Sequence, residues 1–239
     1  MDQASSSSTS EADSGSSISD EITDTKEISI REKKYFIDYT KIIGSGKDGK
    51  VYIATCDNVE YAAKVIKSDT CFKNEKNVCF EYSCLHEIKH ESIVKVFGWT
   101  EEKNYIIMEL IKGQLENNYT EDALRKIFKQ IFNVVIFIHH NSLLHGDLHN
   151  HNIMIGAEAN PVLIDFGRAK WIHRDHGILK NLPKDYDKVT LVKDIKDLKA
   201  IFSILLNYLD FQSKATKAFK TWLDVENYVG TLEEIQENL

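Results

Sequence analysis

Large apolar residues are almost absent from the beginning of the chain and become frequent only after about position 30. Residues 1–30 are rich in serine and acidic side chains, and after Met1 the first large apolar residue is Ile18. A segment of this composition buries too little apolar surface to offset the entropy lost on ordering. We therefore predict a disordered tail over residues 1–32 and an ordered domain over residues 33–239. The serines of the tail fit a modified or docking segment, and equally a solubilising one.

In the first half of the ordered domain, the apolar residues form short runs rich in β-branched and aromatic side chains, which are typical of strands. These runs are Ile37–Ile43, Val51–Ala54, Glu60–Lys67, Ile93–Trp99 and Tyr105–Leu110. One stretch among them, Lys73–Lys89, has helical spacing instead. Its inward face carries Val78, Cys84, Leu85 and Ile88. The pattern predicts a small sheet with one helix.

The second half of the chain is mainly helical in its pattern. The stretch Thr120–His140 carries an apolar stripe at helical spacing, with Thr120 as a cap and two acidic residues in the first turn. The elements expected after it are the strands Ile153–Ile155 and Val162–Ile164 and the helices Asp194–Tyr208, Lys214–Val225 and Thr231–Leu239.

Composition and charge narrow the class of protein. With 239 residues, of which 42% are apolar, the chain is long enough for one domain or two small lobes. The first 24 residues hold six of the 37 acidic side chains and neither Lys nor Arg, so the remainder has 31 acidic against 30 basic side chains. A nearly neutral body gives no argument for nucleic-acid binding.

Neither a membrane span nor a secretory signal is expected. The longest apolar run, Ile127–Ile138, is interrupted by Lys129, Gln130 and Asn133. The N-terminus lacks the basic start and apolar stretch of a signal peptide. The four cysteines show no spacing typical of zinc, and we interpret them as reduced thiols. These features predict a cytoplasmic protein.

A glycine-rich stretch follows the first predicted strand. Its sequence, GSGKDGKV, contains Gly44, Ser45, Gly46, Gly49 and Val51. Three glycines at this spacing let backbone N–H groups approach phosphate oxygens without obstruction by side chains. A dinucleotide-binding turn leads into a helix, whereas this stretch leads into a predicted strand. It therefore fits a loop between two strands, either over phosphates or as a plain hairpin turn.

The strongest chemical signal lies between residues 145 and 167. The sequence HGDLHNHN contains Asp147 and Asn152, and LIDFG follows with Asp165. A carboxylate such as Asp147 can accept the proton of an attacking hydroxyl, while Asn152 and Asp165 offer the oxygen ligands that magnesium prefers. Four histidines in and before this region offer an alternative, histidine-bound metal: His139, His140, His149 and His151.

These two motifs resemble the catalytic loop and the metal-binding loop of the protein kinases. The resemblance covers about residues 35–239 and implies an α+β, two-lobed protein-kinase-like fold. A small antiparallel β-sheet with one helix would form the N-terminal lobe, about residues 33–110. A mainly helical, abbreviated C-terminal lobe would occupy about residues 111–239.

The resemblance also implies a nucleotide site. Lys64, in the sequence EYAAKVIK, would bind the α- and β-phosphates of ATP and pair with Glu81, for which Glu75 and Glu87 compete. Other positions implied to line the site are Ala62, Met108 as gatekeeper, Glu109 and Ile111. Asp194 would brace the backbone of the catalytic loop, or simply cap a helix.

The chain departs from the kinase pattern in three places. Gly146 replaces the Arg that binds an activation-loop phosphate, His149 replaces a Lys that approaches the transferred phosphate, and no A-P-E follows Asp165. The sequence HGDLH is similar to that of aminoglycoside and other small-molecule phosphotransferases. Imidazole is only partly charged near neutral pH, so His149 would stabilise the transition state less than Lys.

We therefore expect transfer of the γ-phosphate of ATP, with Mg²⁺, to a Ser or Thr hydroxyl of a protein substrate. The alternatives are a small-molecule kinase of the aminoglycoside-phosphotransferase type and a catalytically silent kinase-like scaffold. A further alternative concerns the setting, an effector or viral kinase acting on host proteins in the host cytosol. The acceptor, the regulation and the oligomeric state stay open.

Overall fold

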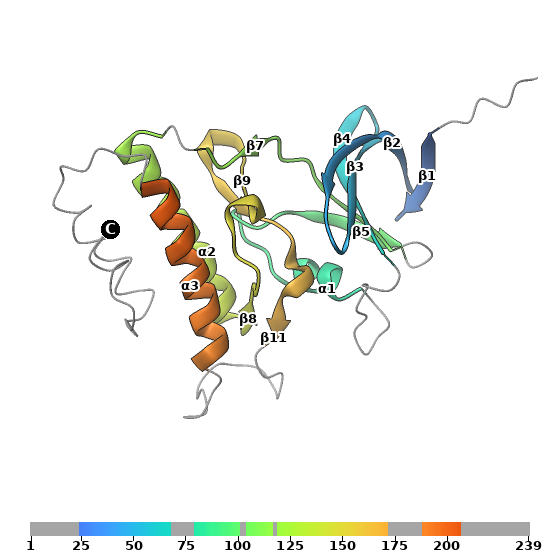
Figure 1. Ribbon diagram of the computed structural model, residues 1–239. Coiled ribbons are helices and arrows are strands. Elements are labelled where there is room, and N and C mark those ends of the chain that lie inside the picture. Colours follow the sequence, from blue (N-terminus) through green and yellow to red (C-terminus); the bar gives the residue numbers. More distant parts are fainter. Residues whose placement is uncertain (1–23, 68–78, 101–103, 117–118, 172–187, 207–239) are drawn as a thin grey trace, which may run out of the picture.

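The computed structural model describes residues 24–67, 79–100, 104–116, 119–171 and 188–206. These residues form two lobes, one built on a sheet and the other on two long helices (Figure 1). Short strands and turns lie between the sheet and the helices (Figure 1). The predicted α+β, two-lobed fold is confirmed.

The N-terminal lobe is one antiparallel sheet in the order β1-β2-β3-β4-β6-β5. Its strands are β1 (Thr25–Ile30), β2 (Lys33–Ser45), β3 (Gly49–Cys56), β4 (Val59–Ile66), β5 (Val96–Thr100) and β6 (Tyr105–Glu109). Helix α1 (Phe80–Glu87) contacts β5. The helix predicted over residues 73–89 is shorter, because Cys79 before it and Ile88 after it have non-helical backbone with ψ 126° and 125°. Residues 68–78 lie outside the described residues.

Strand β1 lies within the segment that we predicted to be disordered. Residues 25–30, which we had placed within the tail of residues 1–32, pair along their length with β2. Ile28 and Ile30 are buried while the other positions of the strand are exposed. Because alternate side chains of a strand face opposite sides, Ile28 and Ile30 lie on the same face, and their burial packs this short segment against the sheet. Residues 1–23 lie outside the described residues.

The C-terminal lobe contains α2 (Glu121–His140) and α3 (Lys188–Leu206). The Thr120 hydroxyl accepts a hydrogen bond from the backbone N–H of Ala123 at 3.3 Å, so Thr120 caps α2 as predicted. Helix α3 begins at Lys188 rather than at Asp194, which therefore lies inside the helix. The helices predicted over residues 214–225 and 231–239 lie outside the described residues.

Five very short strands lie between the large sheet and the two long helices (Figure 1). They are β7 (Gly113–Gln114), β8 (Leu143–Leu144), β9 (Ile153–Ile155), β10 (Pro161–Leu163) and β11 (Lys170–Trp171). Strand β9 pairs with β7 and β10, and β8 pairs with β11, in each case antiparallel. The pairing of β9 with β10 holds the segment that carries Asn152 beside the segment that carries Asp165.

Two apolar clusters hold the fold together. The larger one runs from the sheet through α1 to α2 and α3, and in it the Phe202 ring lies 4.0 Å from the Phe128 ring, centroid to centroid. The smaller one fills the curled sheet. At its open side, a Cβ on Gly98 of β5 would come within 2.2 Å of Ile30 Cγ2 of β1. The missing side chain at position 98 therefore lets β1 approach β5.

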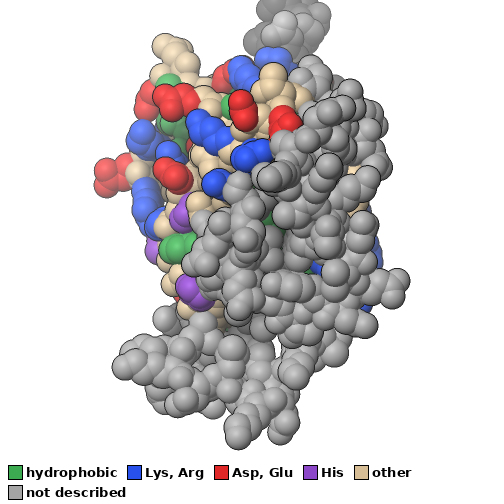
Figure 2. Space-filling view, turned by 90° about the vertical axis from the view of Figure 1, so that its left-hand side faces the viewer, with side chains coloured by type: hydrophobic (Ala, Val, Ile, Leu, Met, Phe, Trp, Pro, Cys, Tyr) green, Lys and Arg blue, Asp and Glu red, His purple; other side chains and the backbone are tan. Residues whose placement is uncertain are grey.

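The described surface carries charges of both signs. Figure 2 shows Lys and Arg intermixed with Asp and Glu on the described part of one face. Among the helices that the structure describes, none combines the length and the apolar character needed to cross a bilayer. Three cysteines of the described residues, Cys56, Cys79 and Cys84, are buried.

Candidate active site

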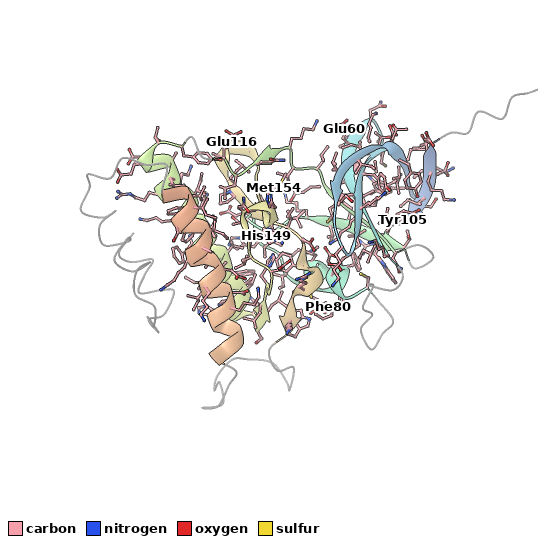
Figure 3. The ribbon with its side chains drawn as sticks, in the orientation of Figure 1. Glu60, Phe80, Tyr105, Glu116, His149 and Met154 are labelled. Atoms are coloured by element: carbon pink, nitrogen blue, oxygen red, sulfur yellow. The ribbon has the colours of Figure 1, made fainter. Side chains whose placement is uncertain are left out.

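A cavity of about 580 Å³ opens between the lobes. This volume suits a ligand of the size of a nucleotide. Figure 3 shows His149 and Met154, two residues of its wall, in the middle of the molecule between the sheet and α3. Every residue that we predicted for the site lines this cavity: Gly44, Ser45, Gly46, Gly49, Val51, Ala62, Lys64, Glu81, Met108, Glu109, Ile111, Asp147, Asn152 and Asp165.

The glycine-rich loop covers one side of the cavity. Strand β2 ends at Ser45 and β3 begins at Gly49, so the loop connects two antiparallel strands and not a strand and a helix. The Gly46 N–H donates to the Gly49 carbonyl at 2.9 Å, which closes the turn. A Cβ on Gly49 would lie 2.2 Å from the Val65 carbonyl oxygen, so a larger residue would push β3 away from β4. Near Gly46 the space is open, with no atom within 4 Å of a Cβ placed there.

Lys64 joins the two lobes through a buried ionic network. Its Nζ donates to both carboxylate oxygens of Glu81 and to Oδ1 of Asp165, each at 2.8 Å. Burial alone would lower the pKa of Lys64, but the charges of Glu81 and Asp165 outweigh it and raise that pKa. Lys64 is therefore a permanent cation. Of the competing glutamates, Glu81 is the one that contacts Lys64, while Glu75 lies outside the described residues.

Asp165 faces the cavity from a left-handed backbone conformation, with φ 60° and ψ 73°. Burial favours its neutral form, but the Lys64 ammonium outweighs burial and holds the pKa of Asp165 below its ordinary value. The next residue, Phe166, is fully buried, and its ring lies 4.7 Å from the His145 ring. This packing fixes the direction in which the ionised Asp165 carboxylate points.

Asp194 and His145 hold the loop that carries Asp147. The carboxylate of Asp194 accepts from the backbone N–H groups of His145 and Gly146, both at 2.9 Å. His145 Nε2 lies 3.0 Å from the Ile164 carbonyl oxygen. Because burial lowers the pKa of His145, the ring is neutral and Nε2 donates its proton to that carbonyl. Asp194 thus braces the loop from inside α3 and does not cap the helix.

Asp147 and Asn152 meet at the floor of the cavity. The Asn152 Nδ2 donates to the Asp147 backbone carbonyl at 2.8 Å, so the amide group of this buried residue has its oxygen left to accept or coordinate. Asp147 has a side chain that is 29% exposed, and His149 Nε2 lies 3.8 Å from its Oδ2. The site therefore combines an accessible carboxylate with an amide oxygen one short turn away.

The residues of the site fit a magnesium ion. An ionised carboxylate at Asp165 and an amide oxygen at Asn152 are hard oxygen donors of the kind that Mg²⁺ takes from proteins. Among the described residues, no group of three or more His, Cys, Asp or Glu side chains is placed to hold a metal. The alternative of a histidine-bound metal therefore receives no support from the described part of the chain.

The cavity wall also contains residues that the sequence analysis did not assign to the site, and Ile43 and Arg168 are two of them. Ile43 lies next to the first glycine of the loop and lines the cavity while remaining 49% exposed. Arg168 follows the LIDFG motif, and its NH1 lies 3.6 Å from Asp147 Oδ1. Arg168 could have been found from its position directly after the LIDFG motif, because a residue so close to Asp165 in the chain lies near the site.

Comparisons with known proteins agree with this geometry. A family model described as protein kinase domain matches residues 37–189. Similar proteins include calcium-dependent protein kinase 6 of Plasmodium berghei, 33% identical over 158 residues (61% of this chain and 10% of the relative). Calcium/calmodulin-dependent protein kinase type 1 of Caenorhabditis briggsae is 29% identical over 166 residues (63% and 45%). Probable serine/threonine-protein kinase 2 of Plasmodium falciparum is 28% identical over 200 residues (74% and 39%). The matched part spans less than half the length of each of these relatives.

Proposed function

The chain belongs to the protein kinase family, and from this premise we propose that it transfers the γ-phosphate of ATP to a hydroxyl of a protein. One observation supports the proposal most strongly. Lys64 contacts Glu81 and Asp165 at once, at 2.8 Å in each case, and all three line the cavity that also contains Asp147 and Asn152. A scaffold without turnover has no need of this set of charges, whereas phosphoryl transfer depends on it.

The roles follow from the contacts. Lys64, oriented by Glu81, would bind phosphate oxygens. Phosphate would replace Asp165 as a partner of Lys64, because the Asp165 side chain is 39% exposed. The glycine-rich loop would cover the phosphates with backbone N–H groups. Asp147 would orient the acceptor hydroxyl and take its proton as the bond to phosphorus forms.

Asn152 and Asp165 would hold the magnesium ion, whose charge neutralises the phosphate oxygens when it is bound. The chain contributes the preorganisation of these ligands. Asn152 is fixed through its amide N–H to the Asp147 carbonyl, and Asp165 is fixed through Lys64 and the N–H of Gly167. Neither ligand has to search for its rotamer when the metal arrives.

A Ser or Thr acceptor is the class that the relatives support, because one of them is named a probable serine/threonine-protein kinase. A second candidate is a small-molecule hydroxyl. It is favoured by His149, which lines the cavity 3.8 Å from the Asp147 carboxylate at the place where protein kinases carry a lysine.

The test uses the purified full-length chain, γ-labelled ATP and Mg²⁺, with and without a cell lysate. Asp165→Asn removes the metal-binding carboxylate while keeping its shape. Asp57→Asn is the matched control, since it removes an acidic charge from a side chain that is 79% exposed in the β3–β4 turn. Protein-bound label, label on small molecules and free phosphate are then separated.

Label on lysate proteins with the wild type and with Asp57→Asn, but not with Asp165→Asn, is the expected result. Label confined to small molecules would favour the second candidate. If no product is labelled while Asp57→Asn and the wild type bind ATP equally, the scaffold alternative replaces the proposal.

A further inference from the structure

Arg168 places a cation beside the candidate base. Its NH1 lies 3.6 Å from Asp147 Oδ1, and both residues line the cavity between the lobes. The Arg168 side chain is 53% exposed, so its guanidinium group reaches the cavity without being buried in the apolar core. The kinase motifs discussed above assign no role to this position.

The backbone of Arg168 is held tightly against the loop that carries Asp147. A Cβ on Gly146 would lie 2.5 Å from the Arg168 carbonyl oxygen, and Gly146 has φ +75°. Only glycine accepts both this conformation and this approach without strain. Two residues after Arg168, Lys170 of β11 pairs with Leu144 of β8, which directly precedes the loop. The base of the Arg168 side chain is thus fixed while its end stays free to move.

Neither Lys64 nor His149 supplies a permanent positive charge for the transferred phosphoryl group next to Asp147. Lys64 Nζ donates to two other carboxylates, those of Glu81 and Asp165. His149 stands where protein kinases carry a permanently charged Lys, and an imidazole is charged only in part near neutral pH. Arginine keeps its charge at any physiological pH and presents several N–H donors that match phosphate oxygens.

We propose that the Arg168 guanidinium is the cation that binds the oxygens of the transferred phosphoryl group, and that it rests beside Asp147 until nucleotide and acceptor are bound. This inference rests on the proposed phosphotransfer function and deepens it. A separation of 3.6 Å is longer than the 2.7–2.9 Å of a strong charge-assisted hydrogen bond. An exposed contact of this kind is weak, so Arg168 can leave Asp147 at little cost.

In the transfer step the acceptor oxygen forms a bond to the γ-phosphorus as the bond to the β,γ-bridging oxygen breaks. The electron pair of that bond leaves with ADP, and the hydroxyl proton passes to Asp147. Arg168 is unchanged by the step. It stabilises the negative charge on the phosphoryl oxygens and, by leaving Asp147, frees the carboxylate oxygen that the acceptor hydroxyl needs.

The kinetic test compares Arg168→Ala and Arg168→Lys with the matched control Lys170→Ala, which removes an exposed cation from the adjoining strand. We expect Arg168→Ala to lower kcat by about 10²–10³-fold with little change in KM for ATP, because the contact forms mainly in the transition state. Arg168→Lys keeps the charge and should retain more activity than Arg168→Ala. Lys170→Ala should stay within about twofold of the wild type, since surface changes of this kind are usually neutral.

Two further measurements separate a catalytic role from a structural one. Guanidinium ion at millimolar concentration should restore part of the activity of Arg168→Ala, and urea, its neutral isostere, should not. By calorimetry, the wild type should bind Mg²⁺–ADP with aluminium fluoride, a mimic of the transferred phosphoryl group, more tightly than Mg²⁺–ADP alone. Arg168→Ala should lose this difference while keeping its affinity for Mg²⁺–ADP.

The inference is overturned if Arg168→Ala retains kcat within about threefold of the wild type. It is also overturned if the lost activity is not restored by guanidinium and the affinities for ADP and for the mimic fall together, because that pattern indicates a structural role. A wild-type chain without any turnover would instead contradict the proposed function itself, so the two failures are distinguishable.

Discussion

The ion pair between Lys64 and Glu81 yields the sharpest prediction about stability. Glu81→Gln keeps the volume of a side chain that is 4% exposed, but replaces one of the two oxygens that accept from Lys64 Nζ at 2.8 Å by an amide donor. The change removes a buried charge and turns one hydrogen bond into a contact between two donors. Lys64 keeps its 2.8 Å contact with Asp165, so its charge is not left without a partner.

The expected loss lies between two limits. Removing one partner of an isolated buried ion pair costs about 3–5 kcal/mol, and losing a neutral hydrogen bond costs about 1 kcal/mol. Because Asp165 continues to neutralise Lys64, we expect the free energy of unfolding to fall by about 2–3 kcal/mol, within the range for hydrogen bonds to charged groups.

Urea unfolding of the full-length chain, followed by circular dichroism, measures this loss. Glu87→Gln on the same helix is the matched control, because Glu87 is exposed and surface changes are usually worth less than about 0.5 kcal/mol. The double variant Lys64→Met with Glu81→Gln should be less destabilised than the sum of the two single variants, since the two side chains contact each other.

The reasoning fails if Glu81→Gln is as stable as the wild type to within about 0.5 kcal/mol. That result would mean that the desolvation of Glu81 cancels its attraction to Lys64, as happens in some buried pairs. Strict additivity in the double variant would contradict the direct contact.

Three further predictions concern the supports of the catalytic loop and the packing of the sheet. Asp194→Asn should lower the free energy of unfolding by about 2–3 kcal/mol. Burial opposes ionisation of Asp194, but the hydrogen bonds from His139 and Gly146 outweigh it and lower the pKa of Asp194, so its stabilising effect is present above the unfolded pKa near 4 and is lost as the pH falls through the folded pKa. Urea unfolding should therefore show a smaller difference between Asp194→Asn and the wild type at pH 3.5 than at pH 7. Gly146→Ala should lower the melting temperature and cost about 1–3 kcal/mol, because position 146 has φ +75° and a Cβ there would lie 2.5 Å from a carbonyl oxygen; an unchanged melting curve would refute this. Gly98→Ala should destabilise the wild type but cost little in an Ile30→Ala background, because the nearest remaining atom of residue 30 is then its Cβ at 3.4 Å. If thermal unfolding shows that Gly98→Ala lowers the stability of the wild type and of Ile30→Ala equally, the docking of β1 on β5 is contradicted.

The sequence predicted the elements whose patterns are strong and local. The cap of Thr120 and the apolar stripe of α2 define that helix without help from the rest of the chain. Each cavity residue proposed from the motifs lies in the wall of one cavity, because the order of strand, glycine loop and strand leaves few ways to arrange these segments.

What escaped prediction depends on contacts between distant segments. Strand β1 has only two buried side chains, Ile28 and Ile30, and its order comes from pairing with β2 rather than from its own composition. The kinase resemblance correctly predicts that Asp194 braces the catalytic loop, and its carboxylate binds backbone N–H groups 48 and 49 residues away in the chain. The predicted start of the helix at Asp194 is wrong, because α3 begins at Lys188. Arg168 directly follows the LIDFG motif, but its closeness to Asp147 depends on the close approach of Gly146 to the Arg168 backbone.

The most direct test of the central claim is the rate of label transfer from γ-labelled ATP by Asp147→Asn. The amide keeps the shape of the side chain but cannot take the proton of the acceptor. The account predicts that kcat falls by about 10²–10⁴-fold, the usual contribution of a positioned base, while the affinity for Mg²⁺–ATP measured by calorimetry stays within about twofold of the wild type. Transfer at the wild-type rate by Asp147→Asn would contradict the assignment of Asp147 as the base and with it the proposed mechanism.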